Sequence, residues 1–98
     1  MFEERRDLRD FLAAILRQPL EALERNRQWI RLQAFRLSIP TEVIEAAEQA
    51  ANEHGPMGAW ASRKGAEQIM RQYHECLTEE ARSRWKRQKM LDPAEIGT

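Results

Sequence analysis

Side chains that commonly perform catalysis or bind metal ions are scarce in this sequence. It contains two histidines, His54 and His74, and a single cysteine, Cys76. His74 and Cys76 are two residues apart, and on a helix two such side chains point about 200° away from each other, so they cannot share a metal ion. The same geometry argues against a Cys–His nucleophilic pair. We therefore expect no bound metal ion.

Motifs typical of enzymes are also missing from the sequence. His54 directly precedes Gly55, where the negative end of a helix dipole favours an imidazole. The acidic pair Glu79–Glu80 has the position of ordinary first-turn residues of a helix. The glycines form neither a nucleotide-binding loop nor a nucleophile elbow. No set of residues supplies nucleophile, base and electrophile together, so the sequence predicts a protein that is not an enzyme and has no cofactor.

The length and composition predict one small domain. The chain has 98 residues, 16 basic and 16 acidic side chains, and 42% hydrophobic residues, which suffice for a single hydrophobic core. No apolar run is long enough to span a membrane, and the N-terminal residues lack the apolar stretch of a signal peptide. A single cysteine forms no internal disulfide, which favours a cytoplasmic location.

The residue pattern is helical throughout. Apolar residues between Leu8 and Leu16 recur at helical spacing, and strand-favouring residues are few. We therefore predict an all-α fold, a single compact bundle of four to five short helices. Pro19 and Gly55 are expected to separate helices. The expected domain covers 1–91, with helices over about 3–18, 19–38, 42–54, 63–77 and 78–90 and a frayed tail over 92–98.

Capping residues predict where several helices begin. Thr41 or Ser38 is a suitable cap for the third helix, and Ser62 for the fourth. Thr78, followed by two glutamates, suits the start of a fifth helix, although one continuous helix up to about residue 90 is equally compatible with the sequence. The uncharged segment Gly55–Ala61 is expected to form a loop packed against the core.

The neutral net charge conceals a segregation of charge along the chain. The segment Arg25–Arg36 contains four arginines and no acid, and the segment Arg82–Lys89 contains five cations and no acid. The predicted third helix, in contrast, carries four glutamates and no lysine or arginine. The basic segments either pair with this acidic helix or bind an external anion such as nucleic acid.

The leading hypothesis is a non-catalytic helical module that binds a partner protein, as an adaptor, regulator, inhibitor or small subunit of a complex. The second predicted helix is apolar on more than one side, which leaves more apolar surface than one small core covers. Another copy of the chain, forming a homodimer, would satisfy the same observation. The predicted protein-binding residues are Trp29, Leu32, Phe35, Met57 and Trp60.

The alternative hypothesis is binding of the nucleic-acid backbone without sequence preference, as in a small subunit of a nucleoprotein complex. Clustered arginines contact phosphates, and nearby aromatic rings can stack on unpaired bases. A helix-turn-helix centred on Gly55 fits poorly, because Pro56 follows the turn at once and Lys64 falls where a buried residue is required. The predicted nucleic-acid contacts are Arg27, Arg31, Arg36, Arg82, Arg84, Lys86, Arg87 and Lys89.

Overall fold

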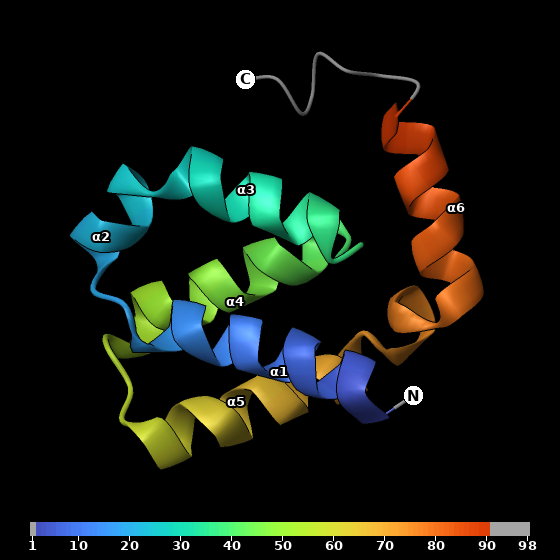
Figure 1. The fold of residues 1–98 in the computed structure, drawn as a ribbon. Helices are drawn as coiled ribbons and strands as arrows, with labels where there is room; N and C mark the ends of the chain where they lie inside the picture. The colour runs from blue at the N-terminus through green and yellow to red at the C-terminus, as the bar shows by residue number, and fades with distance from the viewer. Residues whose placement is uncertain (1, 91–98) are drawn as a thin grey trace.

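The computed structural model describes the backbone of residues 2–90 and the side chains of residues 6–90. All regular structure in this part of the chain is helical, so the predicted all-α fold is confirmed (Figure 1). Six α-helices lie within residues 2–90, instead of the expected four to five. The predicted tail over 92–98 lies outside the described residues. The elements are α1 (Phe2–Arg17), α2 (Leu20–Arg25), α3 (Arg27–Arg36), α4 (Thr41–His54), α5 (Ala59–Gln72), the 3-10 helix η1 (His74–Leu77) and α6 (Glu79–Met90).

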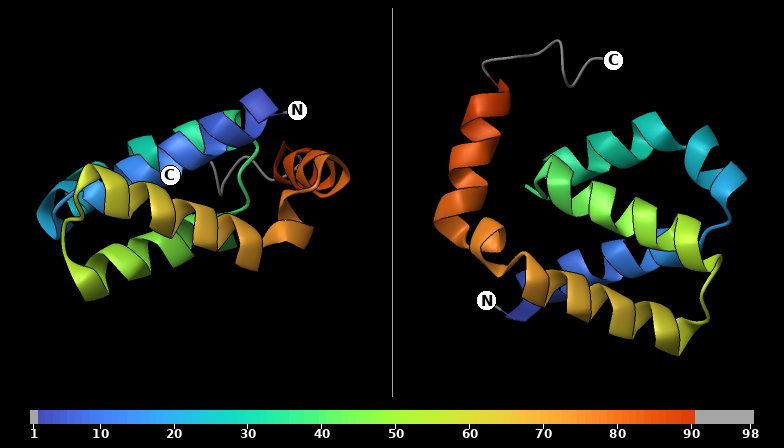
Figure 2. Two further views of the ribbon diagram at one scale, coloured as in Figure 1. Left: turned by 90° about the horizontal axis from the view of Figure 1, so that it is seen from below. Right: turned by 180° about the vertical axis from the view of Figure 1, so that it is seen from behind.

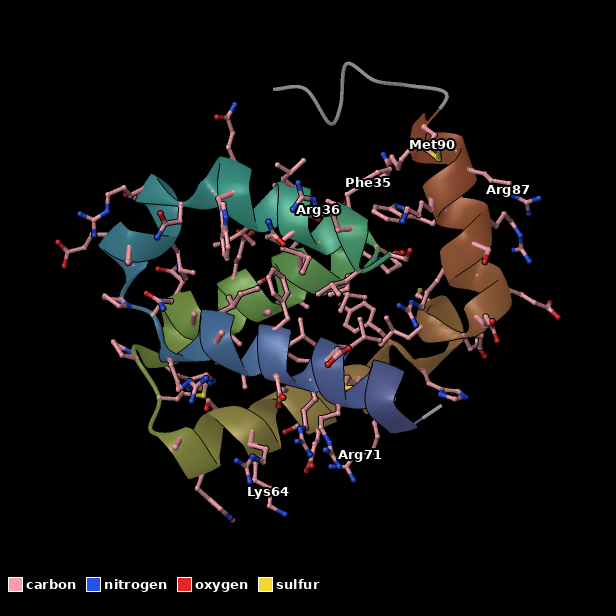
Figure 3. The ribbon with its side chains drawn as sticks, viewed as in Figure 1. Phe35, Arg36, Lys64, Arg71, Arg87 and Met90 are labelled. Carbon is pink, nitrogen blue, oxygen red and sulfur yellow. The ribbon has the colours of Figure 1, made fainter. Side chains whose placement is uncertain are left out.

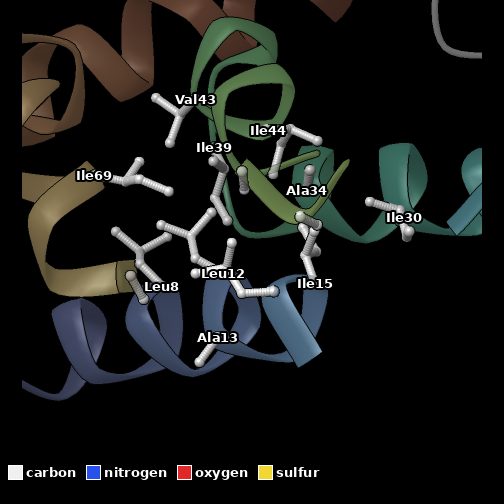
Figure 4. Close-up of a cluster of buried hydrophobic side chains, with 14 of the residues drawn as sticks. Leu8, Leu12, Ala13, Ile15, Ile30, Ala34, Ile39, Val43, Ile44 and Ile69 are labelled. Atoms are coloured by element: carbon white, nitrogen blue, oxygen red, sulfur yellow. The ribbon is translucent and has the colours of Figure 1, made fainter. Parts of the chain in front are cut away.

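Helices α1 and α4 lie at the centre of the molecule, with α3 on one side and α5 on the other (Figures 1 and 2). The predicted apolar stripe of α1 faces this centre, and Leu12 and Leu16 are fully buried. Burial of such side chains is the main stabilising contribution to a domain of this size. The core, drawn in part in Figure 4, contains residues from α1 to α5. Its larger buried members are Leu8, Leu12, Ile15, Leu16, Leu23, Ile30, Ile39, Val43, Ile44 and Ile69.

The helix predicted over 19–38 is divided at Asn26 into α2 and α3. Asn26 has φ −101° and ψ 13°, outside the regular helical region. Asparagine is a poor helix former because its side chain competes for backbone hydrogen bonds. Both α2 and α3 contact α4, and the change of direction between them is visible in Figure 1. The prediction of a single helix was therefore wrong, since a bend keeps both halves against α4.

Helix α3 ends in a Schellman motif built around Ser38. The amide of Ile39 donates a hydrogen bond to the carbonyl of Ala34 at 2.8 Å, and the amide of Ser38 donates one to the carbonyl of Phe35 at 3.0 Å. Ser38 has φ +58°, a left-handed conformation that glycine usually supplies at this position. The buried Ile39 and Ala34 provide the apolar contact of the motif. Ser38 therefore does not cap α4, which instead begins after Pro40 without a side-chain cap at its N-terminus.

Replacing Ser38 with glycine should raise the free energy of unfolding by about 0.5 to 1 kcal/mol. The left-handed conformation costs a non-glycine residue roughly 1–2 kcal/mol, and the greater chain entropy of unfolded glycine offsets about half of this gain. Urea unfolding followed by circular dichroism measures the difference. Ser38→Ala is the matched control, and it should not stabilise the protein because alanine keeps the Cβ atom. A glycine variant less stable than wild type would contradict this account of the turn.

The connector after α4 differs in part from the predicted buried loop. Gly55 terminates α4 as predicted, with φ +74°. The amide of Met57 donates a hydrogen bond to the carbonyl of Leu16 at 3.0 Å. The Met57 side chain packs against the core. Helix α5, however, already begins at Ala59, because Gly58 serves as its N-cap. Trp60 therefore lies in the first helical turn and is 72% exposed, which corrects the expectation that the whole segment packs inward.

The predicted helix over 63–77 is also shorter at its end than expected. The α-helix stops at Gln72, and a 3-10 turn follows from His74 to Leu77. Thr78 then caps α6, since its hydroxyl oxygen accepts a hydrogen bond from the amide of Ala81 at 3.2 Å. The predicted helix start at Thr78 is confirmed. Ser62, predicted to be a cap, is instead buried inside α5 and donates its hydroxyl proton to the carbonyl of Ala59 at 2.9 Å.

Candidate functional site

The outward face of α3 carries two large apolar side chains. Trp29 is 59% exposed and Leu32 is 39% exposed, whereas Ile30 and Ala34 on the opposite face are buried. Residues three or four positions apart on a helix are neighbours, so Trp29 and Leu32 adjoin each other, followed by the exposed Arg36. Of the two apolar sides of this helix that the sequence indicates, one is therefore buried in the core and the other is exposed.

The aromatic ring of Phe35 is partly covered by α6. Its centroid lies 5.9 Å from that of Trp85, with an angle of 55° between the ring planes. The Nζ atom of Lys86 lies 5.3 Å from the same ring centroid, at cation–π distance. The side of α3 that bears Phe35 faces α6 in Figure 3. Phe35 therefore forms part of the contact between two helices and does not belong to the exposed face.

Arg82 attaches α6 to the C-terminal end of α3. Its guanidinium donates hydrogen bonds to the carbonyl of Ser38, at 3.1 Å, and to the carbonyl of Leu37. Carbonyls at the end of a helix lack intrahelical partners and carry partial negative charge, which favours a cation. No residue of α6 is fully buried. These hydrogen bonds, together with the contacts of Trp85 and Lys86 with Phe35, link α6 to the C-terminal end of α3.

The predicted nucleic-acid contacts divide into two groups. Arg31 forms an ion pair with Glu48 of α4, with Nη2 and Oε1 2.8 Å apart, while Arg82 and Lys86 contact the end of α3. One cation of the basic segments thus pairs with the acidic helix, as one of the two interpretations anticipated. Lys89 is half-buried. The exposed members of the set are Arg27, Arg36, Arg84 and Arg87, and Arg87 points away from α3 in Figure 3.

A groove of about 680 Å³ lies between the two basic segments. We call it the α3–α6 groove. Its walls come from α2, α3, α4 and α6, and they combine apolar, aromatic and charged side chains. Phe35 and Trp85 lie where the basic segments meet. The residues that line it are Glu24, Arg25, Arg27, Gln28, Arg31, Ala34, Phe35, Ile39, Thr41, Ile44, Glu45, Trp85 and Lys89.

The five predicted protein-binding residues do not form one surface. Trp29, Leu32 and Phe35 all belong to α3, but Met57 lies in the connector before α5, and Trp60 lies on α5 itself. Helices α1 and α4 separate α3 from α5 in both the front and the back view (Figures 1 and 2). Trp60 has the Nζ atom of Lys64 5.5 Å from its ring centroid. Trp29 and Leu32 are thus the two predicted residues that share an exposed surface.

Cys76 lies in the 3-10 helix and faces acidic neighbours. Burial raises the pKa of its thiol above the usual range, and a hydrogen bond with Glu42 and the negative charges of Glu42 and Glu75 raise it further. The thiol thus keeps its proton near neutral pH, which makes it a weak nucleophile. Among residues 6–90, no group of three histidine, cysteine or acidic side chains is arranged to hold a metal ion.

Sequence patterns did not identify the α3–α6 groove, because its lining residues come from four helices and meet only in the folded chain. No helix in the described part of the chain has the length and apolar character needed to cross a membrane. Comparison with models of protein families, with curated proteins and with solved structures finds no match to the chain.

Proposed function

We propose that this chain is a non-catalytic helical module that binds a partner protein through the outward face of α3. The observation that carries the proposal is the exposure of Trp29 and Leu32 side by side on a helix whose opposite face buries Ile30 and Ala34 in the core. An exposed tryptophan beside an exposed leucine is costly in water and gains free energy when a partner covers both.

The composition of α3 supports a protein partner. Its sequence RQWIRLQAFR contains no acid and no lysine. Protein interfaces are enriched in tryptophan, phenylalanine and arginine and depleted in lysine, glutamate and aspartate. Tryptophan and arginine are also the residues that most often dominate binding energy. Trp29, with Arg36 two helical turns further along the same face, therefore has the composition expected at the centre of an interface.

The competing proposal, nucleic-acid backbone binding, receives less support from the same contacts. Arg31, Arg82 and Lys86 already bond within the chain. On the outer side of α6, Arg84 and Arg87 share a surface depression with Glu79 and Glu80, whose carboxylates repel phosphates. A salt-dependent gel shift with short single- and double-stranded nucleic acid tests this alternative directly.

The double substitution Trp29→Ala/Leu32→Ala should strongly reduce capture of the partner. Immobilised protein is incubated with an extract of the cells that produce it, and bound proteins are identified by mass spectrometry and then purified for titration. We expect the dissociation constant of the double variant to rise roughly 30-fold or more, since a central interface tryptophan contributes about 2 kcal/mol or more. Light scattering decides whether the partner is a second copy of the chain.

Trp60→Ala is the matched control, because Trp60 is at least as exposed but lies on α5. We expect its dissociation constant to remain within about threefold of wild type. A chain that is monomeric and captures no protein, or a Trp29→Ala/Leu32→Ala variant that binds as tightly as wild type, would overturn the proposal.

A further inference from the structure

We infer that the α3–α6 groove receives an acidic segment of the partner protein that also carries apolar side chains. The inference rests on the proposed function, since it names the chemistry of the partner that also covers Trp29 and Leu32. The groove volume of about 680 Å³ lies in the range of specific binding sites, about 300–1,000 Å³. It therefore accommodates several side chains of a bound segment.

The apolar part of the groove defines one half of the ligand's chemistry. Phe35 and Trp85, which are half-buried, supply the accessible apolar surface, because Ile39, Ile44 and Ala34 beneath them are buried in the core. Apolar side chains of a partner gain free energy by covering such a surface. A purely charged ligand would leave the exposed parts of Phe35 and Trp85 in contact with water.

Cations on the wall formed by α2 and α3 define the charged part of the ligand's chemistry. Arg25 and Arg27 line the groove, are exposed, and form no ion pair with another described residue. Lys89 lines it from α6 on the far side. A guanidinium binds a carboxylate through two parallel hydrogen bonds. Carboxylates that flank apolar side chains therefore match the arrangement of this groove.

Arg31 adds an unsatisfied hydrogen-bond donor to the same wall. Its Nη2 atom bonds to Glu48, but its Nη1 atom is buried and has no acceptor among the described residues. A buried donor without an acceptor is destabilising, so such groups normally bond to water or to a ligand. Arg31 lines the groove, and its guanidinium must turn toward the groove for a bound oxygen to reach Nη1, because that atom has no contact with solvent in the unbound chain.

The residues in and beside the groove favour a peptide over nucleic acid as its ligand. Glu24 and Glu45 also line the groove, and a continuous phosphate backbone would be repelled by them, whereas a peptide can place its few carboxylates beside the arginines. Base stacking needs an open aromatic face. Lys86 lies at the ring of Phe35, and the ring of Trp85 is tilted against it by 55°. Stacking on this pair is therefore hindered.

The groove adjoins the exposed face of α3. Leu32 and Phe35 are three residues apart and are separated by only about 60° around the helix axis. A partner seated on Trp29 and Leu32 therefore reaches the groove by passing over this side of α3. One partner can contact both surfaces.

A selection from a displayed library of random peptides tests the inference. The full chain is the target, and fluorescently labelled copies of the selected peptides are titrated by anisotropy. We expect the selected peptides to be enriched in aspartate and glutamate next to leucine, phenylalanine or tryptophan. The double substitution Arg25→Glu/Arg27→Glu should weaken their binding about tenfold or more, because it replaces attraction by repulsion.

The matched control is Arg63→Glu/Arg71→Glu, which makes the same charge change at exposed positions of α5. Its affinity should stay within about threefold of wild type. Circular dichroism verifies that both double variants are folded. Peptides without acidic enrichment, a selection that yields no peptide sensitive to the Arg25/Arg27 change, or preferential binding of a single-stranded oligothymidine at the groove would overturn the inference. If the partner no longer binds the Trp29→Ala/Leu32→Ala variant but binds the Arg25→Glu/Arg27→Glu variant normally, the proposed function stands and the groove inference falls.

Discussion

Replacing Leu12 with alanine is expected to lower the free energy of unfolding by about 2–5 kcal/mol. Leu12 is fully buried at the centre of α1, the helix that contacts both α4 and α5. The substitution removes apolar contacts and leaves a cavity that rigid neighbouring helices cannot close. Since small domains are stable by only about 5–15 kcal/mol, this loss is a large fraction of the total. Urea unfolding monitored by circular dichroism measures it.

Leu20→Ala is the matched control for this prediction. It makes the same chemical change at a position in α2 that is 47% exposed, where substitutions usually alter stability by about 0.5 kcal/mol. If Leu12→Ala does not fold, Leu12→Met provides a milder test, with an expected loss below about 1.5 kcal/mol. Equal losses at positions 12 and 20 would show that the core does not lie where the structure places it.

Features that depend on short-range chemistry could be predicted from the sequence. The spacing of apolar residues between Leu8 and Leu16 correctly identified the buried face of α1, because a helix in a small domain has few ways to bury such a stripe. Gly55 and Thr78 correctly marked a helix end and a helix start, since backbone conformation and capping act within a few residues. These features give the helical class and most helix boundaries.

Features that depend on contacts between distant segments could not be predicted. Trp60 lies in an uncharged segment that was expected to be a loop packed against the core, but the early start of α5 places this side chain in solvent. The division at Asn26 likewise depends on how α2 and α3 both contact α4. Local composition does not reveal which side of a helix a distant element will cover.

The candidate binding residues show the same limit. Trp29 and Leu32 were selected because their helix is apolar on more than one side, and the structure exposes both. Phe35 satisfies the same pattern, yet Trp85 of α6 packs beside it. Periodicity can detect surplus apolar surface, but only the tertiary arrangement distinguishes the part that another helix of the chain covers.

Arg82→Ala should release α6 from the rest of the domain, while the rest of the domain stays folded. An isolated helix of this length is marginal in water, and no residue of α6 is buried. The substitution removes the hydrogen bonds from Arg82 to the carbonyls of Ser38 and Leu37. Hydrogen bonds to charged groups contribute about 1.5–3 kcal/mol. We therefore expect protection from hydrogen exchange to fall roughly tenfold or more in α6, and much less in α1 and α4.

Arg84→Ala is the control for Arg82→Ala, because Arg84 belongs to the same helix and is exposed. We expect it to leave amide protection in α6 unchanged within about twofold, as is usual for a surface substitution. Release of α6 should also move Trp85 and Lys89 away from the α3–α6 groove. Arg82→Ala should therefore weaken the binding of peptides whose affinity depends on Arg25 and Arg27. Equal exchange rates in Arg82→Ala and wild type would show that other contacts hold α6. Faster exchange with unchanged peptide affinity would show instead that α2, α3 and α4 suffice to form the binding surface, since the wall contributed by α6 would then be dispensable.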